Sequence, residues 1–121
     1  MSKKKKLVIF GSEGRLGQTL IQNLKKDFYI IGVDVKNYTS QTDKFLNSKS
    51  INLANVYSQE IYAVLHCQQF KPEQFVSHSI LDLDLDFTNS VIEVNLLLSL
   101  QSSSEYIKAC KKNNYLGRII N

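Results

Sequence analysis

The chain has 121 residues, 43% hydrophobic and 21% charged, which fits one globular domain with a modest core and leaves no room for a second. Its formal charge is +4, yet four of its 15 basic residues form a single run at positions 3–6. We interpret that run as a solvated lead-in to the first strand rather than a tether to nucleic acid or membrane. No apolar stretch has the length of a membrane span or a signal-peptide core, so a cytoplasmic location is expected.

The two cysteines, Cys67 and Cys110, lie far apart and form no Cys-x-x-Cys pair. Neither has a histidine at metal-ligand spacing, so no zinc site or other metal is predicted. Reduced thiols, as are usual in the cytoplasm, are expected instead of a disulfide framework.

An apolar run at residues 7–10 (Leu-Val-Ile-Phe) is followed at once by three evenly spaced glycines. Such a run is typical of a strand buried on both faces of a parallel sheet. Gly11 then permits a sharp turn, Gly14 lets the backbone approach a pyrophosphate, and Gly17 lets a helix pack close to the sheet. The free N–H groups at the start of that helix would face phosphate.

The next elements support a nucleotide site. An apolar helical stripe is formed by Leu16, Leu20, Ile21 and Leu24. A second apolar run, residues 28–33, ends at Asp34, where a dinucleotide-binding fold accepts hydrogen bonds from the adenosine ribose. Because a carboxylate repels a 2′-phosphate, NAD is predicted rather than NADP; the alternative is a structural turn and a solvated Asp. The predicted cofactor-binding residues here are Gly11, Ser12, Glu13, Gly14, Arg15, Leu16, Gly17, Asp34 and Val35.

The polar segment 35–50 is interpreted as a surface connection with one helical turn around Phe45 and Leu46. Residues 50–53 are predicted to form a short third strand. Asn52 and Leu53 would then lie near the carboxyl edge of the sheet, where an adenine ring can sit. Asn55 fits either that edge or a turn that caps the next helix.

Apolar residues at helical spacing predict a crossover helix over residues 56–70, ended by Pro72. Residues 73–79 are then the fourth strand, which would emerge beside the first. Its Ser77, His78 and Ser79 are predicted to line the cofactor crevice. A histidine titrates near neutrality, but no carboxylate is in place to orient His78, so a wall position is favoured over acid–base catalysis.

Three aspartates alternate with apolar residues at Asp82, Asp84 and Asp86, and Glu93 follows at the spacing of an EF-hand calcium loop. That loop needs glycine at its sixth position, where this chain has Phe87. We therefore expect an acidic loop that ends in a helix N-cap at Asp86, which suits the helix dipole.

A long helix is predicted from the stripe Phe87, Val91, Val94 and Leu98 to a basic end at residues 111–112. Residues 113–114 break it, and residues 117–121 begin a fifth strand. The predicted fold is therefore α/β, a Rossmann-like doubly wound parallel sheet of about five strands, incomplete at its end.

In this order the elements resemble the short-chain dehydrogenase/reductase superfamily, including its sugar-nucleotide epimerase and dehydratase branch. The likeness rests on the glycine turn with Asp34, on residues 71–76, which are similar to the family's Pro-Asp-x-Val, on Val94-Asn95-Leu96, and on residues 117–121. The resemblance implies hydride transfer between NAD and an alcohol, a ketone or a nucleotide sugar. It also implies that Asn95 kinks the long helix and helps to organise a proton relay; the alternative is a helix Asn bonded to backbone.

Two features depart from the family. Ser-His-Ser at 77–79 replaces the Asn-Asn-Ala-Gly or His-x-Ala that ends strand four, and no tyrosine has a lysine four residues on. The family places that Tyr-x-x-x-Lys pair, and a catalytic serine, after strand five. Residues 1–121 are therefore interpreted as a single NAD-binding domain without the catalytic part. The alternative is a non-catalytic dinucleotide-binding or sensor module that acts with a partner.

The surface predicts few other partners. No aromatic or basic motif links the lysine clusters, so nucleic acid is not expected to bind. A sheet cut at its fifth strand exposes an apolar edge and leaves the long helix partly uncovered. Self-association of the chain is therefore predicted.

Overall fold

The computed structural model describes residues 3–37, 41–68 and 85–121. At its centre is a sheet of five parallel strands in the order β3-β2-β1-β4-β5. The strands are β1 (Lys5–Phe10), β2 (Phe28–Asp34), β3 (Lys44–Asn47), β4 (Ala63–His66) and β5 (Ile119–Ile120). Chain order reverses between β1 and β4, the switch point beside which open α/β sheets bind ligands.

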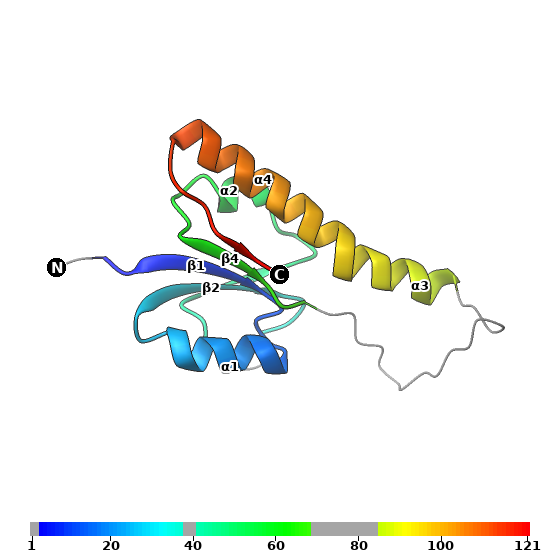
Figure 1. The fold of residues 1–121 in the computed structure, drawn as a ribbon. Coiled ribbons are helices and arrows are strands. Elements are labelled where there is room, and N and C mark those ends of the chain that lie inside the picture. Colours follow the sequence, from blue (N-terminus) through cyan, green and yellow to red (C-terminus); the bar gives the residue numbers. More distant parts are fainter. Residues whose placement is uncertain (1–2, 38–40, 69–84) are drawn as a thin grey trace.

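Helices cover both faces of this sheet, as Figure 1 shows. α1 (Arg15–Leu24) lies on one face, and α2 (Leu53–Val56) lies with a long helix on the other. The long helix consists of α3 (Leu85–Ile92), a π-helical turn η2 (Glu93–Leu97) and α4 (Leu98–Asn113). The predicted α/β fold with a doubly wound parallel sheet of five strands is confirmed.

Alternation along β1 divides the core into two layers, because successive side chains of a strand point to opposite faces. Leu7 and Ile9 pack with Ile21 of α1. Val8 and Phe10 pack on the other face, in the cluster that contains Tyr106 of α4. A run of four apolar residues in β1 is therefore needed to bury both faces of the central strand.

The predicted helix over residues 56–70 is wrong. Its middle forms β4, which pairs with β1 from Leu7↔Ala63 to Phe10↔His66, and only the four-residue α2 precedes it. Ala63, Val64 and Leu65 are buried in succession, as in any strand covered on both faces. An apolar run this short fits either a strand or a helix by periodicity. Residues 73–79, predicted as the fourth strand, lie outside the described ranges.

The third strand is also displaced from its predicted place. It is β3, residues 44–47, which had been assigned to a surface connection with a helical turn. Residues 50–53 lead into α2 instead, and the Asn52 side chain caps that helix by accepting a hydrogen bond from the Asn55 N–H at 3.1 Å. Both ends of β3, Lys44 and Asn47, are polar and exposed, as is usual in an edge strand. The sequence of this strand therefore looks like that of a surface connection.

The two other predicted helices, the first one and the long one, are confirmed with two corrections. Asp86 lies in the first turn of α3 rather than at its N-cap, a position that still suits the helix dipole. Leu16 is 60% exposed, so the buried stripe of α1 consists of Gly17 and Ile21 with Leu20 and Leu24 beside them. Asp82 and Asp84 fall outside the described residues. None of the helices among the residues placed in the structure is long and apolar enough to cross a membrane.

Candidate functional site at the carboxyl edge of the sheet

The glycine turn leaves β1 at the switch point and is held by β2 and β4. Gly11 adopts a φ of +77°, and its N–H donates to the Val33 carbonyl at 2.8 Å. A Cβ at Gly11 would lie 2.7 Å from backbone atoms of Cys67 and Gln68. A side chain at this position is therefore excluded both by the φ angle and by the end of β4.

The same turn brings α1 close to the sheet. A Cβ at Gly17 would overlap the Gly11 carbonyl oxygen, so the predicted role of Gly17 in close packing is confirmed. Gly14 is the N-cap of α1 and supplies no side-chain cap, and the first turn holds no acidic residue. The start of this ten-residue helix is thus suited to receive an anion through its free N–H groups.

Asp34 connects the end of β2 to the glycine turn. Its Oδ2 accepts a 2.9 Å hydrogen bond from the Glu13 N–H, and its Oδ1 accepts one of 2.7 Å from the Val35 N–H. Each carboxylate oxygen can accept a second bond, so the group can still receive ribose hydroxyls. Next to it, Asn47 at the end of β3 donates to the Val35 carbonyl at 3.1 Å. Asn47 is not among the predicted site residues because residues 44–47 were predicted to be a surface connection and not a strand.

At the end of β4, beside the glycine turn, lie His66, Cys67 and Gln68, none of which is among the predicted site residues. His66 pairs with Phe10 in the β1–β4 register, directly before the glycine turn. The predicted wall residues Ser77, His78 and Ser79 lie outside the described part of the chain. The usable sequence clue was a histidine directly after the apolar run Ala-Val-Leu at residues 63–65.

A chain of hydrogen bonds runs from His66 at the edge of the sheet into the core. Its Nδ1 lies 2.8 Å from Oδ1 of Asn121, and its Nε2 lies 3.0 Å from Oγ of Ser102, which lies 2.6 Å from the Tyr57 hydroxyl. An amide oxygen only accepts, so Nδ1 carries the proton and Nε2 accepts from Ser102. Ser102 is wholly buried, and it accepts in turn from Tyr57. Burial lowers the pKa of His66, which favours this neutral arrangement.

The Gln68 side chain forms hydrogen bonds that link the long helix to the carboxyl edge of the sheet. Its side-chain amide donates to Oγ of Ser99 at 2.7 Å and to the Val94 carbonyl, inside the π-helical turn, at 3.3 Å. The helix thus departs from α geometry at Glu93–Leu97, the segment that contains Asn95. The implied change of helix geometry at Asn95 agrees with this turn, while its role in a proton relay stays a prediction.

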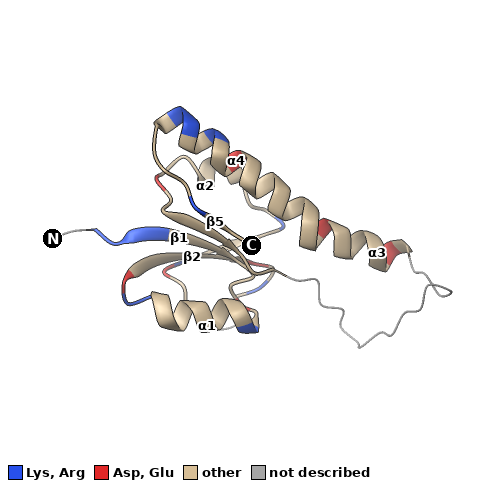
Figure 2. Cartoon of the chain, in the orientation of Figure 1, with Lys and Arg blue, Asp and Glu red and all other residues tan. Residues whose placement is uncertain are grey.

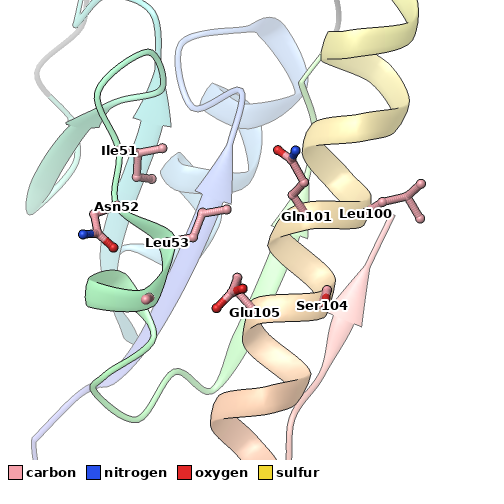
Figure 3. Close-up of a pocket in the computed structure, with 8 residues that line it drawn as sticks. Ile51, Asn52, Leu53, Leu100, Gln101, Ser104 and Glu105 are labelled. Carbon is pink, nitrogen blue, oxygen red and sulfur yellow. The ribbon is translucent and has the colours of Figure 1, made fainter.

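A groove of about 730 Å³ lies elsewhere, between α2 and α4 (Figure 3). Asn52 and Leu53 line it from one side, and Leu100 and Ser104 line it from α4. Neither the glycine turn nor Asp34 contributes to its lining. Among the described residues, no other predicted site residue lines this groove, so Asn52 and Leu53 are the only ones of the predicted cofactor-binding set found there.

The residues that the structure does bring together are the glycine turn, Asp34 and Val35 at the carboxyl edge of β1 and β2. Arg15 is exposed at the start of α1, and Ser12 is wholly buried beneath the turn, against Gly32. No group of three histidine, cysteine, aspartate or glutamate side chains placed to hold a metal occurs within residues 3–37, 41–68 and 85–121.

No protein-family model matches the sequence, and no curated protein matches it. Solved structures do share the fold. A 4-hydroxyisoleucine dehydrogenase complexed with NADH superposes with a TM-score of 0.72 at 22% identity, over 96% of this chain and 54% of that one. A short-chain dehydrogenase from Leptospira borgpetersenii with bound NAD+ gives a TM-score of 0.77 at 17% identity, over 97% and 50%.

An epimerase of known structure shares the fold too. UDP-glucuronic acid 4-epimerase from Bacillus cereus, in complex with NAD, gives a TM-score of 0.64 at 18% identity, over 95% of this chain and 39% of that one. This chain thus spans about half or less of the length of these three proteins. At such identities the likeness concerns the fold: the chain has the Rossmann-like fold found in short-chain dehydrogenases and NAD-dependent epimerases.

Proposed function

We propose that this chain is the NAD-binding part of an oxidoreductase or epimerase/dehydratase of the short-chain dehydrogenase type. The observation that carries the proposal is the bond between the Glu13 N–H and Asp34, which places an acid at the rim of a glycine turn at the switch point. The neighbours with this fold were solved with NADH or NAD, which supports the same cofactor here.

Different residues of the site would bind different parts of NAD. The start of α1 would receive the pyrophosphate, and Asp34 would accept from the adenosine ribose while repelling a 2′-phosphate. When bound, the nicotinamide supplies hydride transfer to or from an alcohol, a ketone or a nucleotide sugar. His66, Gln68 and the π-helical turn of the long helix would border the path of the cofactor toward the substrate.

The residues of this chain do not supply every group that hydride transfer to a substrate requires. No tyrosine in the sequence has a lysine four residues on, so the pair that would lower a phenol pKa and exchange a proton with substrate must come from elsewhere. The same observation favours a second candidate, a non-catalytic dinucleotide-binding or sensor module that acts with a partner. Reduction of a ketone by NADH on the 121-residue chain alone would exclude that second candidate.

The test is calorimetric titration of the chain with NAD+ and NADP+. Asp34→Asn keeps an oxygen to accept from Glu13 but removes the charge that repels a 2′-phosphate. We expect saturable NAD+ binding by the unaltered chain, and in Asp34→Asn a fall of about tenfold or more in the preference for NAD+ over NADP+. Asp27→Asn, at an exposed loop between α1 and β2, is the matched control and should change neither affinity.

Two outcomes would overturn the proposal. One is a folded chain, judged by its circular dichroism, that binds neither dinucleotide. The other is an Asp34→Asn variant whose preference between NAD+ and NADP+ equals that of the unaltered chain.

A further inference from the structure

Basic side chains gather at the amino edge of the sheet, the edge opposite the glycine turn and Asp34. The parallel strands begin here, so β1 brings Lys5 and Lys6 beside the start of β2. Nζ of Lys4 donates to the Lys25 carbonyl at 3.2 Å, which holds the residues before β1 against the end of α1. We call this cluster the basic edge; its members are Lys3, Lys4, Lys5, Lys6, Lys25, Lys26 and Arg118.

An aromatic ring connects the two ends of the chain within the basic edge. The Arg118 guanidinium lies over the Tyr62 ring, with its Cζ 4.0 Å from the ring centroid, and Nζ of Lys5 lies 4.6 Å from the same centroid. Nη1 of Arg118 also donates to the Tyr62 carbonyl at 3.4 Å. Along the sequence no aromatic links the lysine clusters, whereas in the fold Tyr62 contacts cations from both ends of the chain.

The positive charges of the basic edge are not neutralised by the described part of the chain. Among residues 3–37, 41–68 and 85–121, no ion pair involves a member of the basic edge. The adjoining loops contribute only the carboxylates of Asp27 and Glu60, which the cations outnumber. Like charges held together repel one another, so their concentration at one edge favours an anionic partner.

The cations form a line that crosses the layers of the fold. Figure 2 shows basic residues after α1 on one face of the sheet, at the start of β1, before β5 and at the end of α4 on the other face. Lys111 and Lys112 lie in that last turn of α4 and extend the line. In this view the start of β1 projects beyond the ends of both helices. A flexible chain of phosphates can follow such a bent line, whereas a flat membrane contacts only its projecting part and a stiff duplex bends at a cost.

We propose that the basic edge binds the phosphodiester backbone of single-stranded nucleic acid. Its lysines contact phosphates as point charges. Arg118, held flat against Tyr62, presents its remaining N–H groups to a phosphate as a planar fork. Such contacts recognise the backbone and not the bases, so binding is independent of sequence. The surface lies at the opposite edge of the sheet from the glycine turn, so this inference does not rest on NAD binding.

The test is fluorescence anisotropy of a labelled oligothymidylate of about 20 nucleotides, titrated with the 121-residue chain at about 50 to 200 mM salt. We expect saturable binding whose logarithm of affinity falls linearly with the logarithm of salt concentration, by about 0.7 per phosphate contacted. Arg118→Gln should weaken binding by about fivefold and make this slope shallower by about 0.7. An oligouridylate of the same length should give similar results, because the contacts are with phosphates.

Two further variants separate position from net charge and from folding. Lys49→Gln is the matched control: it removes the same charge from an exposed lysine after β3, toward the carboxyl edge of the sheet. It should change the affinity by less than about twofold, because salt screens charges at that distance. Lys26 is exposed in the loop after α1, so Lys26→Gln should fold as the unaltered chain does and still weaken binding by about threefold.

Four results would overturn the proposal. The first is a folded chain that does not bind the strand at the lowest salt concentration. The second is equal weakening by Arg118→Gln and Lys49→Gln, which would mean that net charge alone attracts the strand. The third is displacement of the strand by NAD+, which would place it at the glycine turn. The fourth is binding to vesicles that contain about 30% phosphatidylserine without binding to the strand, which would assign the basic edge to a membrane.

Discussion

His66 and Asn121 join the ends of two neighbouring strands, with Nδ1 of the histidine 2.8 Å from the asparagine amide oxygen. The backbone pairing of β5 with β4 covers only Val64↔Ile119 and Leu65↔Ile120. The side-chain bond extends this short pairing to the carboxyl edge, beside the candidate site. The place of Asn121 after β5 therefore depends on His66, whose ring is also held by Ser102.

Ser102→Ala should lower the free energy of unfolding by about 1–3 kcal/mol, because the Tyr57 hydroxyl and His66 Nε2 would both lose their partner inside the core. Urea unfolding of dilute protein measures the change. Ser104→Ala is the matched control on the same helix; Ser104 is exposed, and its loss should alter stability by no more than about 0.5 kcal/mol. Equal costs for the two substitutions would contradict a stabilising role for the hydrogen bonds of Ser102.

The stability of the chain should fall in mild acid because of His66. Burial lowers its pKa, and the bond to Asn121 opposes this by a smaller amount. The folded state then binds fewer protons than the unfolded state as the pH falls below about 6.5, so folding is disfavoured there and is unaffected above. A protonated ring would also donate from Nε2 to Ser102, so the serine hydroxyl proton would lose its acceptor on the ring.

Unfolding measured from about pH 5 to 8 in the unaltered chain and in His66→Gln isolates this effect. His78 is present in both proteins and cancels in the comparison. We expect the stability difference between the two to shrink or reverse toward low pH. A difference that is constant over the whole range would show that His66 keeps its ordinary pKa in the folded state.

The parts of the fold that the sequence predicted are those with local causes. Residues 7–10 must be a buried strand, Gly11 must turn, and Asp34 must follow the second strand, because each of these patterns fits few other structures. Val64 and Leu65 fit a helix or a strand equally well, and only pairing with β1 decides between them. Tertiary contact thus determined the elements that the sequence left ambiguous.

The candidate site also contains residues that a local motif predicts and residues that only tertiary contacts bring together. Gly17 and Asp34 were predicted because the motif that contains them is contiguous. His66 and Ser102 were missed because their significance lies in a contact between residues 36 positions apart, which no periodicity records. A polar residue on a helical stripe, such as Ser102, is ordinarily solvated, and only the packed structure shows that it is buried.

Tyr106 should make the chain sensitive to alkali. Its hydroxyl donates to the Ile61 carbonyl at 2.6 Å and accepts from the Arg118 N–H at 3.2 Å, which links α4 to the segments that lead into β4 and β5. Burial raises the pKa of Tyr106 to about 12. The unfolded phenol loses its proton near pH 10, so stability is full below that pH and is lost as the pH rises from about 10 to 12.

Tyrosinate absorbance followed together with circular dichroism tests this expectation. The ionisation of Tyr106 should coincide with unfolding, whereas exposed phenols ionise before it. In Tyr106→Phe the late part of the absorbance change should shrink, and stability at neutral pH should fall by about 1–2 kcal/mol for the lost hydroxyl bonds. Full ionisation of every tyrosine in a still-folded protein would contradict the burial of this group.

Gly11→Ala should be far more damaging than Gly117→Ala. An alanine at Gly11 must keep a φ of +77° and would place its Cβ 2.7 Å from the backbone of Cys67 and Gln68, which cannot move without breaking β4 from β1. At Gly117 the contacts are with side chains, Cys110 Sγ at 2.7 Å and the Tyr106 ring at 3.1 Å, and φ is not positive. Both substitutions reduce the entropy of the unfolded chain equally, so this contribution cancels in the comparison. We expect Gly11→Ala to cost at least about 2 kcal/mol more in urea unfolding, and equal costs would mean that β4 does not constrain the glycine turn.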